Sequence, residues 1–132
     1  MTISEFINQT LRNNVEIQKA TNGRIYEFET EQGVHDYPII FWKIISDNPI
    51  SEDLFSTGEA WKCEVQVSVF ARSSAISLRL ADVVRGLFNR SKTYDEEILS
   101  SRANQVMPSF DSADSVIHSI VRVFINHKIS NA

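Results

Sequence analysis

The stretch Ala60–Ala71, AWKCEVQVSVFA, decides the fold of this 132-residue chain. Apolar residues occupy every second position and the positions between them are largely polar, which is the period of a strand with one face on a core and one in water. Phe70 departs from this pattern because it falls on the wet face, where an aromatic ring needs a helix or a neighbouring chain to cover it. The stretch therefore predicts a half-buried strand and makes Phe70 a candidate interface residue.

Further strands are expected on both sides of this one. The run Ile39–Ile45 follows Pro38 and is short, apolar and rich in β-branched residues, which favours a central strand. Because it is adjacent in sequence, we expect it to pair antiparallel with Ala60–Ala71. Shorter patterns at 24–28 and 97–99 predict two minor strands. The apolar run Val116–Ile125 predicts a strand inside the sheet.

Two segments have helical spacing. Thr2 and Glu5 form a capping-box pattern, and the apolar residues behind them share one helix face. These residues are Ile3, Phe6, Ile7 and Leu11. Ser73–Ser74 supplies an N-cap for a second helix that runs to about Arg90. Gly86 inside this helix costs about 1 kcal/mol relative to alanine, which a close approach of another backbone would explain.

The order of these elements is helix, three strands, helix, then one or two strands. Strands joined by hairpins and helices kept apart from them are typical of the α+β class. We therefore expect a mainly antiparallel sheet of about four strands with two helices packed on one face. The length favours a single domain over residues 1–132, large enough to fold without disulfides or metals.

Composition excludes several classes of protein. The chain is 42% hydrophobic and 23% charged, as in ordinary soluble domains, and no apolar run reaches the ~20 residues of a membrane span. Its first residues lack the pattern of a signal peptide. Cys63 is the only cysteine, so no internal disulfide can form and a reducing cytoplasm suits the chain. Its place in the alternating strand indicates a small buried apolar residue rather than a nucleophile.

Charge is distributed unevenly along the chain. The net charge of −4 argues against a dedicated nucleic-acid binder. Residues 27–59 hold eight acids and one base, whereas residues 60–92 hold six bases and two acids. These segments are either two solvated faces of a monomer, or an acidic face of one copy that meets a basic face of another.

No pattern for catalysis or metal binding is found in the sequence. One cysteine and three scattered histidines do not give the paired ligands of a zinc site. The acidic run 95–97 fits a solvated turn, since no general base with an orienting partner lies near it in sequence. We therefore expect no catalytic residue, no cofactor and no metal, and a protein that is not an enzyme.

From Gly23 to Phe88 the sequence resembles the tail-terminator and tail-completion proteins of lambda-like siphophages. The resemblance lies in an ordered set of short segments, which follow a helix at the start of the chain. They are Gly23–Tyr26, Tyr37–Phe41, the acidic polar stretch Ser46–Glu59, Trp61–Ala71 and the helical Ala81–Val84. About half of the chain carries the likeness, and none of these segments is an active-site motif.

The resemblance implies a non-enzymatic virion protein that assembles in the host cytoplasm. Its copies would form a ring, a hexamer, that caps the finished tail tube, ends its growth and offers a surface to a head completion or connector protein. DNA would only pass through the lumen, and no membrane would be involved. The expected lumen or inter-subunit residues are acidic, with basic residues on the opposing face. The two groups are Asp47, Glu52, Asp53 and Glu59, and Arg79, Arg85 and Arg90.

Other functions fit the same sequence. The nearest is a head-to-tail joining or minor tail protein of similar fold, which only its contacting partner would distinguish. Another is a cytosolic α+β module that binds a small ligand as a dimer, which a concave apolar pocket with converging polar groups would favour.

Overall fold

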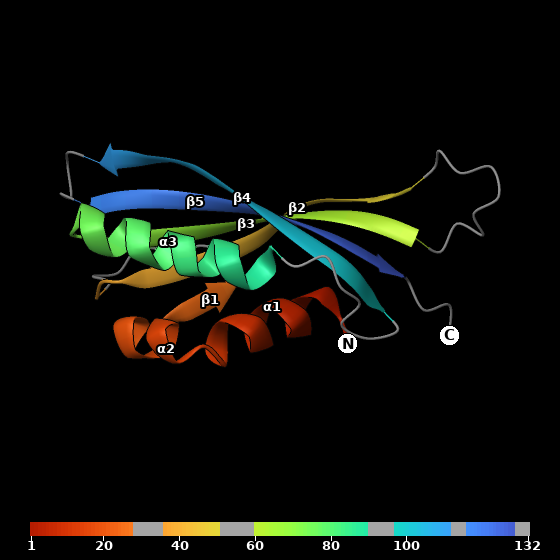
Figure 1. Cartoon of the computed structure of the whole chain (residues 1–132), viewed down its shortest axis with the longest axis horizontal. Coiled ribbons are helices and arrows are strands. Elements are labelled where there is room, and N and C mark those ends of the chain that lie inside the picture. The colour runs from red at the N-terminus through yellow and green to blue at the C-terminus, as the bar shows by residue number, and fades with distance from the viewer. Residues whose placement is uncertain (28–35, 51–59, 90–96, 112–115, 129–132) are drawn as a thin grey trace.

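The computed structural model describes residues 1–27, 36–50, 60–89, 97–111 and 116–128. A single five-stranded sheet carries three helices on one face (Figure 1). The elements are α1 Ile3–Arg12, α2 Val15–Thr21, β1 Ile25–Glu27, β2 Ile39–Pro49, β3 Ala60–Ala71, α3 Ser74–Phe88, β4 Ile98–Asp111 and β5 Val116–Lys128. The strand order is β1-β2-β3-β5-β4, with β1 parallel to β2 and every other pair antiparallel.

The α+β class with a mainly antiparallel sheet is confirmed, although the details differ from expectation. The first helical segment is two helices, because the Asn14 side chain accepts a hydrogen bond from the Ile17 N–H at 3.0 Å and caps α2. The strand expected at 97–99 is the fourteen-residue β4. Its first half is polar, so the sequence showed no apolar period there. As the edge strand of the sheet it pairs only with β5 among the described strands.

The predicted pairing of the two central strands is confirmed. Ile40 lies opposite Val69 and Trp42 opposite Val67, so their side chains share the face on which the helices pack. On its other side β3 pairs with β5 over its whole length. The strand that dominates the sequence pattern is therefore the middle strand of the sheet.

The core lies between the helices and this face of the sheet. Phe6 of α1 and Phe88 of α3 meet edge to face, with ring centroids 5.7 Å apart. Trp42 is buried beneath α1, and its Nε1 donates to Asn8 Oδ1 at 3.4 Å. Burying side chains of this size contributes about 1.5–3 kcal/mol each. These contacts hold three elements from distant parts of the sequence together.

The sheet continues past the ends of α1 and α3 (Figure 1), where residues 44–50 of β2 and 60–64 of β3 form a hairpin arm that stays paired with β5. The Ile50 N–H donates to the Ala60 carbonyl at 2.9 Å and joins the ends of the two strands. Several apolar side chains on the arm are exposed to solvent, because no helix covers this part of the sheet. Ile44, Ile45 and Ile50 are 39%, 46% and 36% exposed. The arm therefore presents three exposed isoleucines, although Cys63 on its inner side is fully buried.

Candidate functional site

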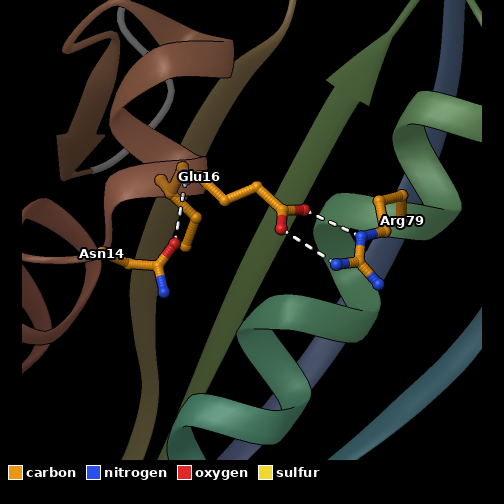
Figure 2. A network of polar contacts seen from close by, with 4 residues as sticks. Asn14, Glu16 and Arg79 are labelled. Carbon is orange, nitrogen blue, oxygen red and sulfur yellow. Dashed lines mark hydrogen bonds and ion pairs between the residues drawn. The ribbon is translucent and has the colours of Figure 1, made fainter.

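The basic residues of α3 have acidic partners within the same chain. Arg79 donates from Nε and Nη2 to the two carboxylate oxygens of Glu16 on α2, at 2.8 and 2.9 Å (Figure 2). The Asn14 cap places Glu16 in the first turn of α2, where the helix dipole favours an acid. The hydrogen bond from Arg79 lowers the pKa of Glu16, and the same bond raises the pKa of Arg79. The positive charge of Arg79 is therefore neutralised by Glu16 of the same chain.

The other two predicted basic residues of this helix differ from each other. Arg85 forms an ion pair with Asp82 one turn earlier on α3. Both side chains are exposed, so the pair is available to a partner as a dipole rather than as a bare charge. Arg90 lies outside the described residues. A role of Arg79, Arg85 or Arg90 between subunits stays a prediction.

Asp47 is the one predicted acidic residue that the structure describes; Glu52, Asp53 and Glu59 lie outside the described residues. Asp47 Oδ1 is 2.8 Å from Nε2 of His127, which is 7% exposed. The contact links β2 to β5 across the intervening β3. No local pattern in the sequence indicates this contact, because the two residues are eighty positions apart. Asp47 therefore joins the arm to β5 through its side chain.

Phe70 lies on the sheet face that carries no helix, as its place in the strand pattern predicted. Its ring stacks on His118 at 4.1 Å and meets Phe41 edge to face at 5.8 Å. Tyr26 continues this row beyond Phe41. Rings of the chain's own sheet therefore cover much of Phe70, and the remaining half-buried surface keeps it a candidate contact.

The same bare face becomes cationic toward the arm. Strand register aligns Lys43, Gln66, Arg122 and Asn104 in one row across four strands. The next rows hold Glu64, Phe124 and Arg102, and then Lys62, Asn126 and Ser100. We call the surface formed by Lys43, Lys62, Arg102, Arg122 and Lys128 the cationic face. No single segment of the sequence displays this surface, because its residues come from four strands and from both halves of the chain.

A hollow of about 500 Å³ lies at the arm end of this face. It is lined by Ser46, Asn48, Pro49, Ile50, Lys62, Glu64 and Phe124. Phe124, Pro49 and Ile50 make it partly apolar, and the Lys62 ammonium lies 5.4 Å from the centre of the Phe124 ring. Such a surface suits a segment of protein that carries both apolar and acidic side chains.

A second hollow, of about 560 Å³, lies at the opposite end of β3. Its lining includes Tyr37, Arg72 and Ile76, and the Arg72 guanidinium lies 4.9 Å from the centre of the Tyr37 ring. Neither hollow is an enclosed apolar cavity of the kind that a small-ligand module needs.

The described residues contain no arrangement for acid–base or metal chemistry. Among them, no group of three His, Cys, Asp or Glu side chains is placed to hold a metal ion. Cys63 is fully buried, as its strand position predicted. Burial, with smaller effects of Asp47 and Glu64, raises its pKa to about 12, so the thiol stays protonated. Within the same ranges, no helix is long and apolar enough to cross a membrane.

Comparison with solved structures finds chains of similar fold. A chain in a solved structure, "Virion of native gene transfer agent (GTA) particle", superposes with a TM-score of 0.67. The two chains therefore share a fold. The match covers 93% of this chain and 92% of the other at 8% sequence identity, so the likeness is one of fold. No protein-family model matches the sequence. No curated protein matches it either.

Proposed function

We propose that this protein is a structural component of a phage or phage-like virion, and that its copies form a ring, a hexamer, on the end of the completed tail tube. The observation that carries the proposal is the match to a protein of a gene transfer agent virion over nearly the whole of both chains. The sequence resemblance to tail terminators agrees with that match and supplies the finer role. The protein would act by shape and self-association rather than by chemistry.

Ring formation requires two different complementary surfaces on each copy, related by a rotation that closes. The chain offers exposed isoleucines on the arm at one end of the sheet and cationic side chains on the sheet face without helices, and the two surfaces meet at the hollow lined by Ile50 and Lys62. A ring built in this way can bind the tube with one rim and present another surface on the opposite rim. Tube growth ends because that second rim does not resemble a tube subunit.

The partners of such a ring are further copies of this chain, the tail tube protein, and a head completion or connector protein. DNA would pass through the lumen, where an acidic surface would avoid the phosphate binding that Lys and Arg produce. The alternative function is that of a head-to-tail joining or minor tail protein. A joining or minor tail protein would use the same surfaces of this chain. It would differ from a tail terminator in the part of the virion to which it binds first.

The decisive experiment measures assembly with and without tail tubes. Light scattering gives the mass of the free protein, negative-stain imaging shows rings or capped tube ends, and a tube-polymerisation assay shows whether elongation stops. We expect rings or caps and arrested elongation. Ile45→Asp on the arm should abolish them, while Val15→Asp, at a more exposed position on α2, should not. A monomer or dimer that ignores tubes contradicts the proposal, and binding to connectors without tubes favours the joining function.

A further inference from the structure

The charge of the cationic face opposes the charge of the whole chain. The protein has a net charge of −4, yet this face gathers five cations around a single acid, Glu64. Within the described part of the chain, no carboxylate forms an ion pair with any of the five. Arg79 and Arg85, by contrast, are each matched by an acid of the same chain. Among the described residues, the cationic face is therefore a positive surface without acidic partners.

The opposite charge is concentrated at the end of the hairpin arm. The chain joins Ile50 to Ala60 through nine residues, SEDLFSTGE, that contain three acids and no lysine or arginine. The two residues that flank this segment, Ile50 and Ala60, are hydrogen-bonded to each other at the end of the paired strands. It also contains Leu54 and Phe55, so it combines apolar and acidic side chains.

We propose that the cationic face, with the hollow over Phe124, is the docking surface for the acidic end of the hairpin arm of a second copy. The inference rests on the proposed ring and names its inter-subunit contact. Leu54 or Phe55 of one copy would enter the apolar hollow, and Glu52, Asp53 and Glu59 would meet Lys62, Arg122 and their neighbours. Donor and acceptor are different surfaces, so the contact is heterologous and repeats from copy to copy.

Nucleic acid is the other polyanion that such a face could bind, and the chain argues against it. Each Lys or Arg contact with phosphate strengthens binding to DNA, whereas a terminal ring has to let DNA slide past. The net charge of the whole chain would also repel DNA. In every assembly, by contrast, each cationic face has one acidic segment of a neighbouring copy available to bind it.

Zero-length crosslinking tests the contact in the unaltered protein. Rings, formed alone or on tube ends, are prepared from equal amounts of ¹⁴N and ¹⁵N protein and treated with a carbodiimide, which joins a lysine to a carboxylate in contact with it. We expect mixed-label crosslinks from Lys62, Lys43 or Lys128 to Glu52, Asp53 or Glu59. Rings that give only same-label crosslinks between these residues, or none, overturn the inference.

Charge reversal supplies the second arm of the test. Lys62→Glu with Arg122→Glu reverses the acceptor, Glu52→Lys with Asp53→Lys reverses the donor, and the quadruple variant restores complementarity. We expect each pair to raise the protein concentration needed for rings at least about tenfold, and the quadruple variant to regain most of that loss. Lys19→Glu on α2 is the matched control, and thermal unfolding confirms that each variant is folded.

The outcomes separate this inference from the proposed function. If the unaltered chain forms no ring alone or on tube ends, both are overturned. If the acceptor-reversed protein, confirmed as folded, assembles like the unaltered one, only the docking contact is overturned. Binding of short duplex DNA at 150 mM salt that disappears in the acceptor-reversed variant would assign this face to nucleic acid instead.

Discussion

Glu16 of α2 and Arg79 of α3 lie sixty-three positions apart in sequence and hold each other through two parallel hydrogen bonds of 2.8 and 2.9 Å. The pair ties the short second helix to the long third helix on the outer side of the helical layer (Figure 2). It also changes the meaning of the basic residues on α3. A subunit contact that used Arg79 would have to break this pair or accept Glu16 together with it.

Replacing Arg79 should restore the ordinary titration of Glu16. The hydrogen bond from Arg79 lowers the pKa of Glu16, so the pair stabilises the fold above the unfolded-state pKa and loses that effect as pH falls through the lowered value. In Arg79→Gln we expect the pKa of Glu16 to rise, measured by carboxyl NMR titration. The stability difference from the unaltered chain should be small, weaken with salt and vanish in acid. Identical Glu16 titrations in both proteins would show that the pair does not form in solution.

Removing the Asp47 carboxylate should destabilise the folded protein. His127 is almost fully buried and would lose its side-chain partner on β2, so we expect Asp47→Ala to lower the free energy of unfolding by about 1–2 kcal/mol. Asp47→Asn keeps an acceptor and should cost less. Asn48→Ala, exposed on the same strand, serves as the control in urea unfolding. Equal midpoints for Asp47→Ala and the control would remove His127 as a structural partner.

The thiol of Cys63 should be unreactive in the folded protein. Burial raises its pKa to about 12, so little thiolate exists at pH 8, and alkylation with iodoacetamide should be at least about a hundredfold slower than in urea. Because the folded pKa lies above the unfolded one, this group's contribution to stability is complete below about pH 8.5 and is lost as pH rises toward 12. Unfolding of Cys63→Ala should therefore depend less on pH between 8 and 10.5. Native labelling as fast as in urea would contradict the buried position.

Gly86 should tolerate a side chain in the isolated subunit. The sequence suggested a close backbone approach, but a Cβ built there meets no atom within 4 Å among the described residues, and the position is exposed on α3. Gly86→Ala should raise the free energy of unfolding by about 1 kcal/mol, measured by urea titration. If the variant is more stable yet forms rings less well, the glycine serves a contact between copies. A loss of stability in the monomer would restore the original explanation.

Local pattern in the sequence determined the elements that bury side chains at a regular period. The alternation of Ala60–Ala71 gave the central strand, the apolar run after Pro38 gave its partner, and the cap at Ser73 gave the start of α3, because burial on one face leaves a period that a single segment displays. β4 was predicted only at its first residues. The residues that follow Leu99 are largely polar and show no such period. The division of the first helix depended on one hydrogen bond from Asn14.

Tertiary structure alone decided which charges meet. Arg79 finds Glu16 only when α2 and α3 lie on the same face, and Asp47 reaches His127 only because β5 lies next to β3, between β3 and β4. The same insertion aligns Lys43, Gln66, Arg122 and Asn104 in one row, which produces the cationic face. Sequence records how many charges a chain has and where they stand along it. Strand order and register determine which of them end as neighbours, and these depend on packing between segments far apart in the chain.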